Sequence, residues 1–257
     1  MATGSFSSPL LRQLFPTGDV GQLWTDSAEI RAMLIVLGAL AQVQGQMGLI
    51  PADSAAFINR SSVEVQIDPA GLAAQTARDH GPVPALVTAF QRAMEAPEHG
   101  GYALHDTPPE HIADTGLMLR LRQTLAVLET RAQGLDAAID GHLSGLPLLR
   151  DTGLVVAAPP ATRAGVAAAL KLGDPGDDWS ADRGPVHQIA AWLATLTHLA
   201  GAAAAGHPVL TALSTQMNAL QAMLTAPAAF PLVERMALPQ IALSAACAVE
   251  TARAAAS

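Results

Sequence analysis

Apolar residues recur along most of this chain at intervals of three and four, which is the period of an amphipathic helix. The longest such stripe runs from Ile112 to Leu143, over about eight helical turns. It consists of Leu117, Leu121, Leu125, Leu128, Ala132, Leu135, Ile139 and Leu143. A helix of this length needs partners along its apolar face, so the pattern predicts a helical bundle or an oligomer.

The same spacing predicts a first helix that begins with Asp26 or Ser27 as its N-cap and ends at Gly48. Proline and glycine interrupt residues 97–109 and 145–184, so we expect loops there, with only a short helix over 164–172. Pro239 should kink or break the last helical region. The remaining predicted helices cover residues 71–78, 85–96, 185–205, 208–224 and 241–255.

Composition supports an all-α fold, because half of the 257 residues are hydrophobic while only 4% are aromatic and alanine is abundant. A net charge of −8 with one lysine, Lys171, argues against nucleic acid as a partner. The first residues lack the basic start and apolar run of a signal peptide, and the most apolar later stretch carries polar side chains. Cys247 is the single cysteine and cannot form an intrachain disulfide. We therefore expect a cytoplasmic protein that does not enter a membrane.

Three segments carry a resemblance to a known family. They are Trp24 to Pro51, Ser8 to Phe15 and Asp114 to Arg122. Together they resemble the fumarase, aspartase and adenylosuccinate lyase superfamily, and within it the 3-carboxy-cis,cis-muconate cycloisomerases. The resemblance implies a fumarase/aspartase-like helical bundle. The central helices would be shortened, since dozens of family residues are missing between Lys171 and Trp179. It also implies lactonisation of a carboxymuconate in protocatechuate breakdown, the β-ketoadipate pathway, without a cofactor.

The catalytic segments of that family are altered here. The family's His-x-Gly-x-Thr-Ser-x-Asp segment, followed shortly by Asp-Thr, corresponds to Leu104 through Thr115, with Pro108 and Pro109 at the Thr-Ser positions. The mobile loop Gly-Ser-Ser-x-Met-Pro-x-Lys-x-Asn-Pro, which supplies the family's base, is absent, and only Gly206 to Val209 marks its place. A family glutamate of the first helix is Leu37. The resemblance thus implies a retained scaffold with lost or much reduced activity.

Any remaining activity must use other residues, and we name six candidates. His105 and His111 are the catalytic candidates, because imidazole can transfer protons near neutral pH. A second family segment, Gly-Arg-Thr followed by Gln-x-Ala-x-Pro-x-Thr-x-Gly, resembles Arg150 to Gly165, and the family motif Trp-His-x-Gln-Arg-Asp resembles Trp179 to Gly184. Guanidinium groups bind carboxylates through paired hydrogen bonds, so the resemblance implies a carboxylate site in these two segments. The substrate-binding candidates are Arg150, Thr152, Trp179 and Arg183. As alternatives, Arg183 pairs with Asp177, Asp178 or Asp182, and Trp179 anchors a helix edge.

Three functions stay open. The first is a cycloisomerase-like protein of reduced activity, and the second is a non-catalytic relative that oligomerises or binds a carboxylate or a partner. The third is a metal-dependent hydratase or lyase that uses the loop bearing His99, His105 and His111, although we predict a solvated loop without a metal. We further predict a homo-oligomer with a small carboxylate ligand. The expected domains are residues 1–110, a central bundle over 111–225 and a C-terminal segment over 226–257.

Overall fold

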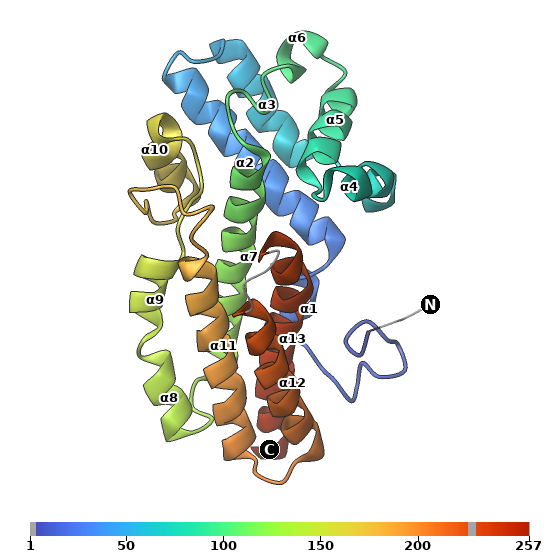
Figure 1. Ribbon diagram of the computed structural model, residues 1–257, viewed down its shortest axis with the longest axis vertical. Coiled ribbons are helices and arrows are strands. Elements are labelled where there is room, and N and C mark those ends of the chain that lie inside the picture. The colour runs from blue at the N-terminus through green and yellow to red at the C-terminus, as the bar shows by residue number, and fades with distance from the viewer. Residues whose placement is uncertain (1–3, 226–229, 257) are drawn as a thin grey trace. The chain divides into compact units, whose positions relative to one another are not determined.

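The computed structural model describes residues 4–225 and 230–256. Within these residues the regular elements are helices, and the single pair of bridged extended residues is Val155 with Gly173. The predicted all-α class is therefore confirmed (Figure 1). The elements are α1 (Val20–Leu23), α2 (Asp26–Gln46), α3 (Ala52–Glu64), the 3-10 helix η1 (Pro69–Leu72), α4 (Ala73–Asp79), α5 (Val83–Met94), α6 (Pro97–Gly100), α7 (Pro109–Ala132), α8 (Ala137–Leu143), α9 (Leu146–Gly153), α10 (Pro160–Leu170), α11 (Gly184–Ala203), α12 (Pro208–Leu224) and α13 (Phe230–Ala256).

The chain forms two compact units. Unit 1 contains the described parts of residues 1–24, 121–153 and 183–257, and unit 2 contains residues 25–120 and 154–182. Helix α7 contributes its first half to unit 2 and its second half to unit 1. The predicted domain boundaries after residues 110 and 225 rest on the resemblance to the larger enzymes, and they stay predictions.

Unit 2 is built on α2, which packs against α3 and against the first half of α7. Helix α2 begins where the Thr25 hydroxyl accepts a hydrogen bond from the Ala28 amide at 3.2 Å, so the expected cap at Asp26 or Ser27 was one or two residues late. Small residues let the helices approach closely. A Cβ atom on Gly116 of α7 would lie 3.1 Å from Met33 Cγ of α2.

Helices α2 and α7 run antiparallel in unit 2. Glu29 pairs with Arg120 at 3.5 Å, and Gln44 Nε2 donates to the carbonyl of His105, just before α7, at 2.7 Å. Residues later in α2 thus contact residues earlier in the chain near α7, as expected for antiparallel helices. Buried apolar side chains fill the space between these contacts, among them Leu34, Leu37 and Ile112. This packing fixes the first turns of α7, where the predicted site residue His111 lies.

Unit 1 contains the packed helices α11, α12 and α13 (Figure 1). Leu213 of α12 and Cys247 and Ala248 of α13 belong to one buried cluster. Phe6 and Phe15, from the segment before α1, pack edge to face with ring centroids 6.1 Å apart and cover this cluster. The N-terminal segment is thus part of the core of unit 1.

Several predicted boundaries were wrong. The stripe from Ile112 to Leu143 is two helices, because Gly134 has a φ of 77° and Asp136 caps a new helix, α8. Helix α13 continues through Pro239, where buried Leu238 and Ile241 outweigh the lost hydrogen bond. Helix α3 was not predicted, because its polar sequence gives a weak periodic signal, and α6 and α9 form where loops were expected.

Two helices, α2 and the stretch Leu232–Ala256 of α13, are long and apolar enough to cross a membrane. Of their most apolar windows, 67% and 61% are buried inside the protein, as in the core helices of soluble proteins. Length and composition are therefore weak evidence for membrane insertion, and the cytoplasmic location stays a prediction.

Candidate functional site

The first half of α7 contacts residues 154–158 inside unit 2. The Thr115 hydroxyl, fully buried, donates to the carbonyl of Ala157 and accepts from its amide, both at 2.8 Å. The segment Leu154 to Ala158 is buried and is held on its other side by Gly173, whose carbonyl accepts from the Val156 amide at 3.0 Å. Both hydrogen bonds of the Thr115 hydroxyl thus join α7 to the backbone of Ala157.

Trp179 also contacts this segment. Its indole Nε1 donates to the Val156 carbonyl at 2.8 Å, and only 4% of the residue is exposed. The ring is thus buried, and its N–H has a hydrogen-bond partner within the chain.

His111 lies on the first turn of α7 and is 5% exposed. Its Nε2 atom is 3.5 Å from Oδ2 of Asp178, while its buried Nδ1 atom has no hydrogen-bond partner. The Ser180 hydroxyl and amide donate to Asp178 and lower the pKa of that carboxyl, and His111 adds to the effect.

His105 has a different environment. Its carbonyl accepts hydrogen bonds from Gln44 at 2.7 Å and from the Thr107 hydroxyl at 2.9 Å, and its ring lies 6.0 Å from the Tyr102 ring. His99 bonds instead to the Ser54 hydroxyl through Nδ1, at 3.0 Å. The three histidines of the loop thus have separate contacts. Across residues 4–225 and 230–256, no three side chains of His, Cys, Asp or Glu gather as a metal site would require.

The other substrate-binding candidates lie in unit 1. Arg150 Nη2 donates to Glu129 at 2.5 Å, and the Thr152 hydroxyl donates to the Leu148 carbonyl at 2.9 Å. Arg183 makes a bidentate pair with Glu234, and both residues are buried. His187 Nε2 lies 3.7 Å from the same carboxylate.

The two units therefore divide the six candidates. His105, His111 and Trp179 belong to unit 2, whereas Arg150, Thr152 and Arg183 belong to unit 1. Sequence reasoning missed Glu234, 51 residues from Arg183, because no local pattern links the two. The contact between Asp178 and His111 was not predicted either, because the two residues are far apart in the sequence. All six roles remain predictions.

No protein-family model matches the chain. By sequence, it is 33% identical to an N-acetyl-S-(2-succino)cysteine lyase from Enterococcus italicus over 120 residues. This match covers 46% of the chain and 26% of that enzyme, so it spans about a quarter of the relative's length.

Solved structures match over nearly the whole chain. A carboxymuconate lactonizing enzyme from Pseudomonas putida matches with a TM-score of 0.86, over 96% of this chain and 76% of that one. A β-carboxy-cis,cis-muconate cycloisomerase from Acinetobacter calcoaceticus matches with a TM-score of 0.84, over 95% and 76%. A fumarate lyase from Mesorhizobium matches with 0.83, over 93% and 74%. Sequence identity is 19% in each case.

These matches confirm the fold predicted from the sequence. The chain has the fold of the fumarase and aspartase enzymes, and a relative by sequence is a lyase. Two of the three matched structures are cycloisomerases that act on a carboxymuconate.

Proposed function

We propose that the protein is a cycloisomerase-like member of this superfamily that binds a small polycarboxylate and turns over 3-carboxymuconate very slowly. The proposal places its ligand in protocatechuate breakdown, where such a carboxymuconate is lactonised. Matches to two cycloisomerases support the ligand class. The slow turnover rests on the chemistry of the site residues.

The observation that carries the slow turnover is that the polar groups predicted to contact a ligand are bonded within the chain. Arg150 and Arg183 face glutamates. Thr152 donates to the Leu148 carbonyl, and Trp179 donates to the Val156 carbonyl. A catalytic group must instead be directed at the charge that develops on the substrate. Groups committed to internal partners supply little of that stabilisation.

The connection between α11 and α12 gives further support. It is residues 204–207, Ala-Ala-Gly-His, and offers no serine, lysine or asparagine at the place of the family's mobile loop. The single lysine, Lys171, is exposed and ends α10 in a left-handed conformation, with a φ of 55°. In the family reaction the loop serine acts as the base, and the loop lysine stabilises an enolate-like intermediate. The connection between α11 and α12 supplies neither group.

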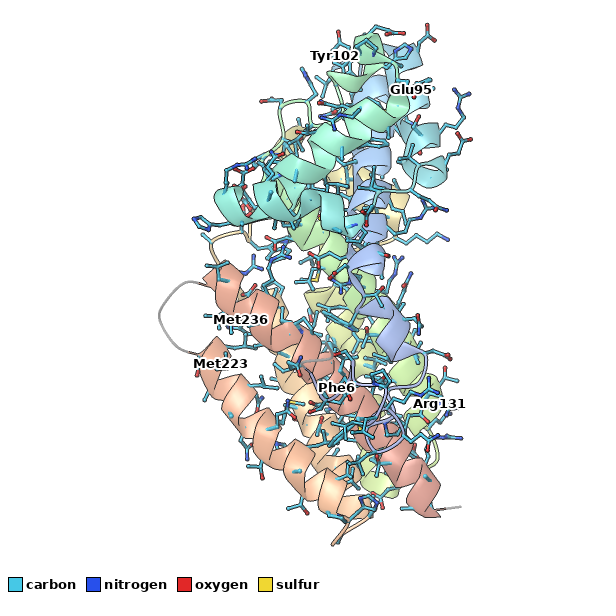
Figure 2. All side chains as sticks on the ribbon, turned by 90° about the vertical axis from the view of Figure 1, so that its right-hand side faces the viewer. Phe6, Glu95, Tyr102, Arg131, Met223 and Met236 are labelled. Atoms are coloured by element: carbon cyan, nitrogen blue, oxygen red, sulfur yellow. The ribbon has the colours of Figure 1, made fainter. Side chains whose placement is uncertain are left out.

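The second candidate function is a non-catalytic relative that keeps the helices for oligomerisation. Large apolar side chains exposed in unit 1 favour it. Met223 at the end of α12 and Met236 near the start of α13 are labelled in Figure 2, and they are 36% and 66% exposed. Leu232 of α13 is 46% exposed.

Isothermal titration calorimetry with propane-1,2,3-tricarboxylate, which cannot lactonise, tests ligand binding separately from turnover. We expect saturable binding with one site per chain. Acetate at the same concentration serves as the control and should give no saturable heat. A tricarboxylate titration without heat at millimolar concentration would contradict the proposed ligand class and favour the oligomerisation function.

A further inference from the structure

A cavity of about 430 Å³ lies in unit 2 where α5 ends and α6 begins. It is lined by Gln91 and Arg92 of α5, by Glu95 and Ala96 in the turn that follows, and by residues of α6 up to Gly101. Its volume falls in the lower part of the range of about 300–1,000 Å³ that small-molecule sites occupy. The cavity therefore suits a small ligand, and its lining includes none of the six site candidates.

Two charged side chains of opposite sign line this cavity. Arg92 and Glu95 are both exposed. Within residues 4–225 and 230–256, neither the Arg92 guanidinium nor the Glu95 carboxylate forms a hydrogen bond or an ion pair. Arg150 and Arg183, in contrast, are paired with glutamates. The charges of Arg92 and Glu95 can therefore be neutralised by a ligand.

Gln91 adds an uncharged polar group to the same wall. Its Nε2 atom donates to the Gly100 carbonyl at 3.0 Å, which holds the side-chain amide beside the cavity. Because Nε2 is the donor of that amide, Oε1 is the acceptor that a ligand can use. The rest of the lining, Ala96, Pro97 and the two glycines, offers apolar and backbone surface.

The backbone at Glu95, which is labelled in Figure 2, has an unusual conformation. This residue follows α5 with a φ of 52°, in the left-handed region where glycine is the usual residue at the end of a helix. Strain of this kind costs stability and is concentrated at ligand sites and other functional positions. The turn places the Glu95 carboxylate three residues after Arg92, so both charges line one cavity.

We propose that this cavity binds a free α-amino acid with an apolar side chain. Arg92 pairs with the ligand's carboxylate, because a guanidinium binds that group through charge-assisted hydrogen bonds. Glu95 and the Oε1 atom of Gln91 accept hydrogen bonds from the ligand's ammonium group, and its side chain packs on Ala96 and Pro97. The two charges of the ligand complement those of the lining, whereas Glu95 would repel a second carboxylate. The inference goes beyond the proposed function and does not depend on it.

Isothermal titration calorimetry with L-leucine tests the site, beside two analogues that each lack one charge. 4-Methylpentanoate lacks the ammonium group, and L-leucinamide lacks the carboxylate. We expect saturable binding of L-leucine with one site per chain and about tenfold weaker binding of each analogue, as for the loss of a hydrogen bond to a charged group. L-Leucine without saturable heat at millimolar concentration, or equal affinities for the three compounds, would overturn the inference.

A substitution at Gly101 locates the ligand in the cavity. A Cβ atom there meets no atom within 4 Å, and the residue has a φ of −57°, so Gly101→Leu should fold normally. Its side chain should obstruct the cavity and abolish the binding of L-leucine. The matched control is Gly81→Leu, which also has open space around its Cβ atom in unit 2 but lies outside the lining. It should keep the wild-type affinity.

The charged residues are tested in the same way. Arg92→Gln should lower the affinity for L-leucine about tenfold, whereas Arg78→Gln, at an exposed arginine in the last turn of α4, should leave it unchanged. Glu95→Gly should weaken binding and yet raise the unfolding midpoint in urea, since glycine adopts a positive φ without strain.

The outcomes separate this site from the proposed function. Wild-type affinity for L-leucine in both Gly101→Leu and Arg92→Gln would place the amino acid elsewhere and overturn the inference. Failure of L-leucine to bind leaves the polycarboxylate proposal standing, because that proposal is tested with the tricarboxylate. Failure of the tricarboxylate to bind likewise leaves the amino-acid site standing.

Discussion

Arg183 and Glu234 form a bidentate ion pair inside unit 1, with Nη2 2.6 Å from Oε2 and Nε 2.9 Å from Oε1. Their side chains are 7% and 4% exposed. The pair joins the residue before α11 to the beginning of α13, two elements that are far apart in the sequence. Because neither charge can reach much water, each depends on the other.

Breaking this pair should destabilise the protein strongly. Arg183→Met or Glu234→Gln leaves one buried charge without its partner, which typically costs about 3–5 kcal/mol. The double variant Arg183→Met with Glu234→Leu should recover most of the loss, since it buries no charge. Urea unfolding followed by circular dichroism measures the three free energies.

Arg150→Met provides the matched control, because the Arg150 and Glu129 side chains are 33% and 39% exposed. Exposed pairs contribute about 1 kcal/mol or less. Equal losses in Arg183→Met and Arg150→Met would show that burial does not set the strength of the Arg183 pair.

Acid should weaken unit 2 through Asp178 and Asp174. The pKa of Asp178 is lowered by hydrogen bonds from Ser180, and that of Asp174 by the Gly176 amide and then by Arg163. A carboxyl with a lowered folded-state pKa stabilises the fold above its unfolded pKa of about 3.9. That stability is lost as the pH falls through the lower folded value.

The unfolding midpoint in urea should therefore fall between about pH 5 and pH 2. Asp178→Asn and Asp174→Asn should each start from a lower stability at pH 7 and fall less steeply. If both variants keep the wild-type slope below pH 5, these two carboxyls do not carry the acid sensitivity.

Cys247 should react slowly in the native protein. The residue is fully buried, and burial raises the pKa of its thiol to about 11. At pH 8 only about 0.1% of such a thiol is thiolate, the reactive form. Ellman's reagent should therefore give little colour with native protein and one equivalent after addition of guanidinium. Rapid reaction of the native protein would show that the α12–α13 region opens readily.

We expect the protein to form a homodimer or homotetramer. The exposed Met223, Leu232 and Met236 are apolar side chains of the kind that interfaces cover. Sedimentation at micromolar concentration should give a mass that is a multiple of the 26.4 kDa chain. Met236→Glu is expected to shift the equilibrium toward the monomer. A wild-type monomer at that concentration would remove this expectation.

Helices were predicted best where the apolar period agrees with the proline and glycine residues that begin or end a helix. Helix α12 has the predicted bounds, because Pro208 starts it and its apolar residues repeat regularly. Helix α3 escaped detection because serine, asparagine and arginine dilute its pattern. The break at Gly134 was missed because apolar residues continue in register on both sides. The predicted break at Pro239 was wrong because burial of the neighbouring side chains outweighs the low helix propensity of proline.

Prediction of the site was limited by long-range pairing. The sequence identified His111, Trp179 and Arg183 as chemically notable, and all three are buried. It could not show that Glu234 accepts from Arg183 or that the backbone at Val156 accepts from Trp179, since these contacts join segments separated by 51 and 23 residues. Such pairings decide which polar groups remain available to a ligand.

The turnover of 3-carboxymuconate by the purified protein tests the central claim most directly, measured beside the Pseudomonas putida enzyme under identical conditions. Loss of a general base alone costs about 10²–10⁴-fold, and this chain also lacks the lysine and asparagine of the mobile loop. We predict a rate that is undetectable or several orders of magnitude below that of the reference enzyme. A turnover number comparable to the reference would contradict the account and would require a catalytic group outside the family's loop.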